Sequence, residues 1–486
     1  MLHLPVLRGG RPYRSRSLHR LTDVRSGEPV AEVSQANAGL VARDLATGAV
    51  GAASLSRLDT ARLLEISRAA ALAFHDGVLP VGDEEQGPED YVRQLSATTG
   101  MPGSLARANM GKIRYVLEEM ETVLSGLTRG LDLSVLDRGH GRQGGCRVSF
   151  RRETPVLGAV LPNNSPGVHS LWLPAVALKV GLALKPGARE PWTPVRIAQA
   201  LLASGCPADA VGVYPTDHSG ATELLLRCGR SMLFGDQGTV GPWLEDPRVE
   251  VHGPGWSKVV LGEDAPELWR RHLDLLADSV AANGGRSCVN ASGIWTCAEG
   301  REIAEALAAR LVGIEARGLD DPQARLAAFP DRVAAYRLSA HIDRQLDVAG
   351  AIDLTAALRP AGRVAEVDGC AFLLPTVVLC DSADHPLARS EFLFPFVAVV
   401  ETPRPALVAS LGETLVATAL TEDPTLVDEL RAARHVDRLN VGPIATSTVA
   451  WDQPHEGNLF DLLYHRRAYQ AAEPRAETHP PPAPAA

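Results

Sequence analysis

The chain has 486 residues, which is enough for two or three domains, with 45% apolar residues and a net charge of −10. Such an acidic chain is poorly suited to binding the phosphate backbone of nucleic acids. We expect a cytoplasmic protein, because no apolar run is long and clean enough to span a bilayer and the N-terminus lacks the apolar core of a signal peptide.

The first 150 residues are predicted to be mostly helical, because their apolar residues recur at helical spacing. The clearest helices are expected at residues 58–79, 88–102 and 104–130. From residue 155 onward, short apolar runs alternate with helical segments, which predicts βαβ units and a parallel sheet. Strands are expected at residues 156–162, 182–186, 210–215 and 231–236, and helices between them at 168–181, 195–205 and 221–229.

A second α/β segment follows, and it contains the stretch AANGGRSCVNAS at residues 281–292. In this stretch a single cysteine, Cys288, lies among glycine, serine and asparagine. The tail at residues 471–486 is rich in Ala, Pro and Glu and is predicted to be disordered. Further strands are expected at residues 291–297, 372–380, 394–402 and 437–442, and helices at 301–313 and 427–435.

Six short motifs occur in order along the chain. Taken together, they resemble the aldehyde dehydrogenase superfamily over roughly residues 30–445. Each motif alone is weak evidence, whereas their shared order is specific. The motifs are VLPNNSPG (160–167), GLALKPGAREPWTP (181–194), FGDQGTVG (234–241), NGGRSC (283–288), EFLFPFVAVV (391–400) and RLNVG (438–442).

The resemblance implies an aldehyde dehydrogenase-like α/β fold in three parts. N-terminal helices and a Rossmann-type NAD(P)-binding domain would occupy residues 1–245, and a catalytic domain 246–435. Residues 436–470 would form a C-terminal return and oligomerisation segment. We expect residues 138–153 to form a small oligomerisation arm that pairs with a strand-like segment near 447–451, in a homodimer or homotetramer.

The resemblance also implies NAD(P)-dependent oxidation of an aldehyde through a thiohemiacetal and a thioester on Cys288. The Asn164 side chain would stabilise the oxyanion together with the Cys288 amide. Lys185 and Glu391 would bind the two riboses of the cofactor. Pro162 and Gly238 would lie in turns that face the cofactor.

Taken without the motifs, each of these residues has an ordinary interpretation. Cys288 would be an inert loop residue and Asn164 a turn residue. Lys185 and Glu391 would be solvated surface charges. The ordered motif set is what favours catalytic and binding roles over these interpretations.

One departure from the family pattern concerns the general base. Hydrolytic members carry a glutamate just before the strand that precedes the cysteine, and here the alignment places Val251 there, with Glu250 and His252 beside it. Glu250 would serve as the base after a one-residue slip, although such a slip points a strand side chain to the other face. The acyl acceptor therefore stays open between water and coenzyme A, and the alternative function is a CoA-dependent acylating aldehyde dehydrogenase or acyl-CoA reductase, acting on an acyl thioester.

Two further departures concern the cofactor. Asp236 falls in the turn that would approach the pyrophosphate, where a carboxylate repels phosphate. Ala188, followed by Arg189, stands where many NAD-preferring members have glutamate, so NAD and NADP both stay open. These departures keep a third hypothesis, a catalytically silent homologue that binds a partner.

No metal site is expected from this sequence. The seven cysteines are scattered and form no CxxC pair. The histidines have no metal-ligand spacing either, and this holds for His169, His218, His252 and His455.

Overall fold

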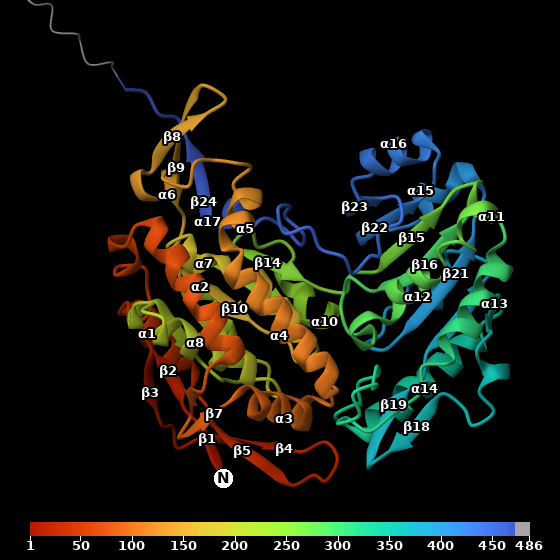
Figure 1. Cartoon of the computed structure of the whole chain (residues 1–486), viewed down its shortest axis with the longest axis horizontal. Helices are drawn as coiled ribbons and strands as arrows, with labels where there is room; N and C mark the ends of the chain where they lie inside the picture. Colours follow the sequence, from red (N-terminus) through yellow and green to blue (C-terminus); the bar gives the residue numbers. More distant parts are fainter. Residues whose placement is uncertain (472–486) are drawn as a thin grey trace, which may run out of the picture.

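The computed structural model describes residues 1–471, so the predicted disordered tail lies outside the described residues except for Ala471. Figure 1 shows two lobes side by side, the first coloured red to yellow-green and the second green to blue. A small arm projects from the first lobe. Within residues 1–471, no helix combines the length and the apolar character needed to cross a membrane.

The first lobe is built on a seven-stranded sheet in the order β14-β13-β10-β11-β12-β2-β3. The first five strands in that order are parallel, whereas β2 and β3 are added antiparallel at one edge. This arrangement confirms the expected βαβ pattern. The strands are β2 (Val6–Arg8), β3 (Arg11–Tyr13), β10 (Val156–Val160), β11 (Gly181–Lys185), β12 (Val211–Val213), β13 (Arg230–Phe234) and β14 (Val249–His252).

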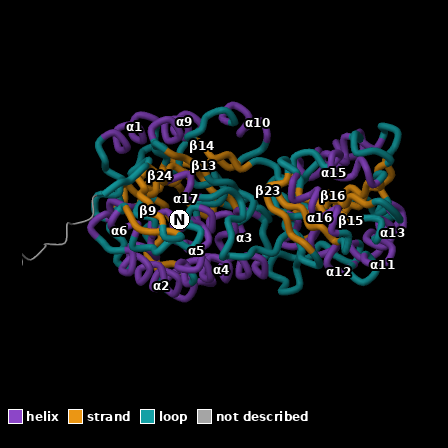
Figure 2. Tube along the Cα trace, turned by 90° about the horizontal axis from the view of Figure 1, so that it is seen from above, coloured by secondary structure: helices purple, strands orange, loops and turns teal. Residues whose placement is uncertain are grey.

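Helices cover both faces of this sheet. Figure 2 shows α1, α9 and α10 on one side of the strands and α2, α4 and α5 on the other. Trp172 and Trp192 are fully buried in the core, as expected for large aromatic residues. The helices are α1 (Ala38–Ala46), α2 (Thr60–Asp76), α3 (Pro88–Thr99), α4 (Gly103–Glu118), α5 (Met120–Leu127), α6 (Val135–Arg138), α7 (Pro174–Ala177), α8 (Trp192–Ala203), α9 (His218–Arg227) and α10 (Gln237–Val240).

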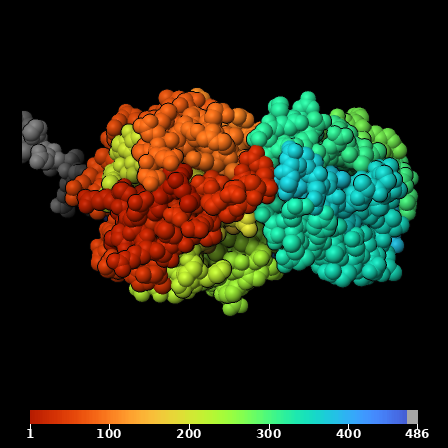
Figure 3. Space-filling model, turned by 90° about the horizontal axis from the view of Figure 1, so that it is seen from below, coloured from red at the N-terminus to blue at the C-terminus, as the bar shows by residue number. Residues whose placement is uncertain are grey.

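The prediction of a mostly helical N-terminus is wrong for the first 34 residues, which form strands. Here β1 (Leu2–Leu4), β4 (Leu18–Thr22) and β5 (Pro29–Ser34) make a separate sheet. The turn between β4 and β5 reaches the second lobe, where Arg25 forms an ion pair with Asp320 at 2.9 Å. Figure 3 shows this red segment against the green-blue lobe. A two-stranded hairpin, β6 (Leu79–Val81) and β7 (Glu84–Gln86), follows α2.

The second lobe has its own seven-stranded sheet, in the order β17-β20-β21-β16-β15-β22-β23. All pairs are parallel except β17 with β20. Its strands are β15 (Ser257–Leu261), β16 (Ala291–Thr296), β17 (Ala351–Asp353), β20 (Thr376–Cys380), β21 (Phe396–Glu401), β22 (Thr414–Leu420) and β23 (Val436–Val441). Its helices are α11 (Ala265–Leu268), α12 (Leu273–Ala281), α13 (Gly300–Leu311), α14 (Arg332–Leu346), α15 (Leu407–Ser410) and α16 (Pro424–Ala432).

The sheets correct the expected domain boundaries. Strand β14 continues the first sheet to His252, and β23 continues the second sheet to Val441, so the boundaries expected at residues 245 and 435 both move later. The strand expected at 372–380 is broken at Pro375, which lacks a backbone N–H. Its two halves lie in different sheets, because β19 (Cys370–Leu373) pairs with β18 (Val364–Val367) and β20 pairs with β21.

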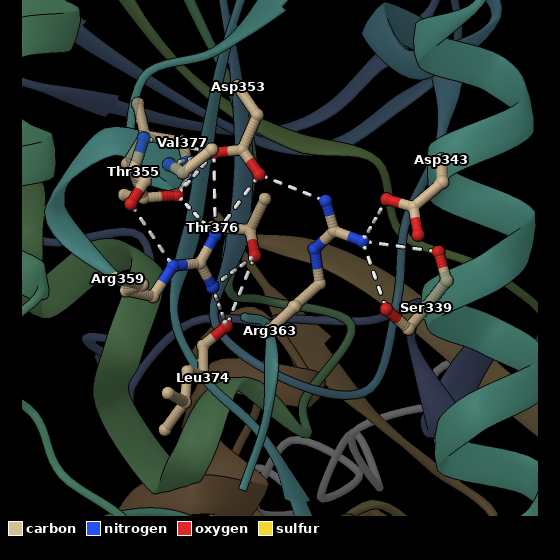
Figure 4. Close-up of polar contacts among 10 residues, drawn as sticks. Ser339, Asp343, Asp353, Thr355, Arg359, Arg363, Leu374, Thr376 and Val377 are labelled. Atoms are coloured by element: carbon tan, nitrogen blue, oxygen red, sulfur yellow. Dashed lines mark hydrogen bonds and ion pairs between the residues drawn. The ribbon is translucent and has the colours of Figure 1, made fainter. Parts of the chain in front are cut away.

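A buried ionic cluster anchors the antiparallel edge strand β17. Asp353 accepts hydrogen bonds from Arg359 Nη2 at 3.0 Å and from Arg363 Nη2 at 2.9 Å, and all three side chains are nearly inaccessible to solvent. Figure 4 shows the two guanidinium groups on either side of the carboxylate. Asp343 on α14 also binds Arg363, at 2.7 Å. The cluster therefore ties the β17 edge to a helix that packs beside it.

The arm is a three-stranded sheet in the order β24-β9-β8. Its strands are β8 (His140–Gln143), β9 (Cys146–Arg152) and β24 (Tyr464–Arg467), and β24 follows α17 (Leu459–Leu463). The segment 138–153 thus supplies two strands of this sheet, but the expected pairing with residues 447–451 is wrong, because β9 pairs with β24. Trp451 instead packs against Tyr115 on α4, with ring centroids 6.1 Å apart. The apolar Trp451 therefore contributes to the packing of the first lobe and not to the arm.

Candidate active site

Cys288 lies in a loop between α12 and β16, where the chain makes an unusually close approach to another segment. A short 3₁₀ turn (Ala282–Gly285) leads into the loop, and Asn283, Gly284 and Gly285 all have positive φ. A Cβ at residue 285 would lie 2.4 Å from the carbonyl carbon of Phe394. A glycine is therefore required there. This close contact places the Cys288 loop directly against the turn that carries Glu391.

The Cys288 thiol faces a carboxylate. Its Sγ donates a hydrogen bond to Glu456 Oε2, with the two atoms 3.5 Å apart. Burial and the neighbouring Glu456 carboxylate raise the pKa of Cys288 well above its ordinary value. The sulfur therefore rests as a protonated thiol at neutral pH, and the group that lies within reach of its proton is Glu456.

Glu456 comes from the C-terminal segment, between β23 and α17, and only 10% of its side chain is exposed. Although burial disfavours the charged form, the adjacent His455 and the charge of Lys112 lower the pKa of Glu456 to about 2. His455 Nδ1 lies 3.7 Å from the other carboxylate oxygen. Glu456 is thus an ionised carboxylate beside a neutral thiol, so it is in the protonation state that can accept a proton.

Asn164 lies beside the same loop. Its Nδ2 donates to the carbonyl oxygen of Arg286 at 2.8 Å, and its Oδ1 is buried without a hydrogen-bond partner. An amide nitrogen carries two protons, so one remains for another acceptor. The hydrogen bond therefore attaches the Asn164 side chain to the backbone of Arg286, which precedes Cys288 by two residues.

Glu250 lies in the same region but does not contact the sulfur. It is on β14, and its Oε1 lies 3.2 Å from His252 Nε2. A Cβ at Gly457 would lie 2.8 Å from the Glu250 carboxylate, so the C-terminal segment passes directly over it. The His252 ring stacks on Phe234, with centroids 4.4 Å apart. Of these two carboxylates, Glu456 and not Glu250 lies within hydrogen-bond distance of the Cys288 sulfur.

A cavity of about 600 Å³ reaches Cys288 and Glu456 from between the two lobes. The first lobe contributes Gln237 and Val240 at the carboxyl end of β13, and the second contributes Glu413 and Arg438. Proteins with open α/β sheets bind ligands at the carboxyl ends of the strands. A volume of this size is typical of a small-molecule or cofactor site. A nicotinamide cofactor therefore fits the location and the size of the cavity.

None of the four expected cofactor residues lines this cavity. Glu391 Oε2 accepts backbone hydrogen bonds from Gly255 and Trp256, at 2.9 and 2.6 Å, and burial raises its pKa to about 7. Lys185 is half-buried at the end of β11, where burial lowers its pKa. Pro162 is half-buried after β10, and Gly238 is exposed on α10.

Asp236 acts as the N-cap of α10. Its Oδ1 accepts from the Thr239 backbone N–H at 2.8 Å and from the Thr239 hydroxyl at 2.7 Å. Capping satisfies a donor at the start of the helix and accounts for a carboxylate in this turn. Among residues 1–471, no group of three or more His, Cys, Asp or Glu side chains is placed to hold a metal ion.

Comparisons with known proteins identify the fold. No family model and no curated protein matches this sequence. Among solved structures, a γ-glutamyl-γ-aminobutyraldehyde dehydrogenase from Burkholderia cenocepacia is 15% identical, with a TM-score of 0.74 over 96% of each chain. An indole-3-acetaldehyde dehydrogenase from P. syringae, solved with NAD⁺, is 16% identical, with a TM-score of 0.75 over 96% of each chain.

A third similar structure is a 3,6-anhydro-L-galactose dehydrogenase, 13% identical, with a TM-score of 0.76 over 96% of this chain and 99% of that one. At such low sequence identities the similarity shows the fold of the chain and does not show its substrate. In each comparison the aligned region covers nearly the whole length of both chains. The chain therefore has the aldehyde dehydrogenase fold.

Proposed function

We propose that this protein is an NAD(P)-dependent aldehyde dehydrogenase that works through a thioester on Cys288. The observation that carries the proposal is the contact between the Cys288 thiol and the ionised Glu456 carboxylate, 3.5 Å apart, at the meeting point of two cavities. Only a thiolate attacks a carbonyl carbon efficiently, so a buried thiol needs a base within reach. The similar structures are dehydrogenases of aldehydes, which supports the same reaction.

In the first half-reaction the Cys288 sulfur forms a bond to the aldehyde carbon while its proton passes to Glu456. The Asn164 amide and the Cys288 backbone N–H are the donors for the resulting oxyanion. When bound, the nicotinamide ring supplies the acceptor for the hydride that leaves this carbon. The carbonyl then re-forms, which leaves a thioester on Cys288.

In the second half-reaction water is the acyl acceptor. Glu456, having released the first proton to solvent, takes a proton from water as the water oxygen bonds to the thioester carbon. The C–S bond breaks, Glu456 passes its proton to the departing Cys288 thiolate, and the carboxylic acid leaves. One aldehyde and one water are consumed, one hydride is transferred, and two protons are released when the acid ionises. No comparable contact among the described residues supports coenzyme A as the acyl acceptor.

The proposal includes the cofactor site, the assembly and the compartment. We place the nicotinamide half of NAD or NADP in the cavity of about 600 Å³, with Gln237, Val240 and Trp256 on its walls. The similar structures solved with NAD⁺ and with NADP support either cofactor. We further propose a cytoplasmic homodimer or homotetramer in which the β24-β9-β8 arm makes the contact between subunits.

The experiment is a spectrophotometric assay of reduced nicotinamide, with a panel of aldehydes, NAD or NADP, and coenzyme A present or absent. The proposal predicts turnover without coenzyme A and its loss in Cys288→Ser, with cofactor binding retained. Turnover only with coenzyme A would make the protein an acylating enzyme. A wild-type protein that binds neither nicotinamide cofactor would be a silent homologue, and the proposal would be wrong.

A further inference from the structure

A second, smaller cavity reaches Cys288 from a different set of walls. Its volume is about 260 Å³, and it shares only Cys288 and Glu456 with the larger cavity. Its walls come from α4, from the turn after β10, and from the Cys288 loop. Two cavities that meet at one sulfur provide separate places for a cofactor and for a substrate. The smaller cavity is therefore a separate place for the substrate of the proposed reaction.

The walls of this cavity carry a connected polar network. Asn109 Nδ2 donates to Asn283 Oδ1 at 2.8 Å, and Asn283 Nδ2 donates to Ser165 Oγ at 2.9 Å and to Ser287 Oγ at 3.1 Å. Because these side chains hydrogen-bond to one another, the network fixes the shape of the cavity wall. Apolar residues such as Leu105 and Val289 complete the lining.

Lys112 is the cation of this cavity, and among the described residues it has no hydrogen-bond or ion-pair partner. Its Nζ lies 5.5 Å from the centre of the Trp451 ring. A Cβ at Gly167 would lie 3.4 Å from this Nζ and 2.9 Å from Asn109 Oδ1. Glycine at position 167 thus leaves room for the ammonium group inside a polar cradle.

The other charges near the sulfur do not occupy this position. Glu456 belongs to the sulfur end of the cavity and forms no ion pair with Lys112 within 4.0 Å. Arg438 lies on the wall of the larger cavity, where its Nε and Nη1 are enclosed without a partner and its Nη2 donates to the Thr446 carbonyl. Lys112 is therefore the positive charge that a molecule in the smaller cavity would meet.

We propose that the substrate is an aldehyde that carries a carboxylate at the end remote from its carbonyl, and that Lys112 binds this carboxylate. The carbonyl end lies at Cys288 and Glu456, and the anionic end lies in the cradle of Lys112, Asn109 and Gly167. A buried ammonium group gains a charge-assisted hydrogen bond from such a ligand. The inference rests on the proposed function and adds the substrate class to it.

The test compares an ω-carboxylate aldehyde with its ω-amide isostere of equal chain length, in the wild type and in Lys112→Met. The ratio of the two kcat/KM values, carboxylate over amide, should fall about 10- to 100-fold in Lys112→Met, mainly through KM. Lys112→Arg keeps the charge and should retain most of the preference. If Lys112→Met leaves the carboxylate-over-amide ratio unchanged, even with an equal loss of kcat for both aldehydes, Lys112 does not bind the substrate carboxylate, and the inference is wrong.

A binding experiment needs no turnover. The dicarboxylate product should protect Cys288 of the wild type from alkylation by iodoacetamide, and should protect Lys112→Met about 10- to 100-fold less well. The monoamide of the same acid should protect both proteins weakly. Equal protection by the diacid and the monoamide would overturn the inference. Protection by the diacid without turnover of any aldehyde would refute the proposed function and leave the carboxylate site standing.

Discussion

Replacing Glu456 by glutamine removes the base and leaves the shape of the site nearly unchanged. Glutamine cannot accept the proton of the attacking water, so hydrolysis of the thioester should slow by about 10²–10⁴-fold, the range of general-base catalysis. This loss corresponds to about 3–5 kcal/mol of activation free energy. Formation of the thioester also loses the proton acceptor of the Cys288 thiol, but removal of the Glu456 carboxylate lowers the pKa of Cys288, so this step should slow less than hydrolysis.

The assay is rapid-mixing absorbance of the reduced cofactor. In Glu456→Gln a burst close to one equivalent of active sites should precede a slow steady state. Glu250→Gln is the matched comparison, since Glu250 lines the same cavity but does not touch the sulfur. A burst that appears in Glu250→Gln and not in Glu456→Gln would refute the assignment, as would an unchanged steady-state rate in Glu456→Gln.

Three further outcomes follow from the structure. Because burial and Glu456 raise the pKa of Cys288, its alkylation by iodoacetamide should have a midpoint above that of a free thiol, about pH 8.5, and Glu456→Gln should move the midpoint to lower pH. Asp353→Ala leaves Arg359 and Arg363 buried without this partner and should cost about 3–5 kcal/mol in thermal or urea unfolding, whereas Glu65→Gln in the exposed Arg62 pair should cost under about 1 kcal/mol. Gly285→Ala places a Cβ 2.4 Å from the Phe394 backbone and should abolish turnover by moving the Cys288 loop, while Gly144→Ala, in an open turn of the arm that also has positive φ, should retain turnover.

The features that the sequence predicts well are those with a local cause. The alternation of strands and helices from residue 155 is visible because each buried strand is a short apolar run. The loop of Cys288 is visible because close backbone contacts demand Gly284 and Gly285. The first strands have no such signal, because three-residue strands such as β1 and β2 are too short to show alternation of apolar and polar residues.

The proposed base, Glu456, could not be found from the sequence. Glu456 lies 168 residues from Cys288, in a segment without a recognised motif, and only the return of the chain over β14 brings the two together. The role of Asp236 does have a local signal, since an aspartate three residues before Thr239 is typical of a helix N-cap. The expected arm pairing is wrong because Trp451, although apolar, packs on α4 and not in a strand.

The central claim is that Cys288 carries the acyl group. The most direct measurement is the intact mass of Glu456→Gln, quenched in acid after mixing with an aldehyde and the oxidised cofactor. The account predicts an added mass equal to the aldehyde less two hydrogen atoms, located on the peptide that contains Cys288 and absent from a Cys288→Ser variant. Turnover of the aldehyde by the wild type with no such adduct on Cys288 in Glu456→Gln, or with the adduct on another residue, would contradict it.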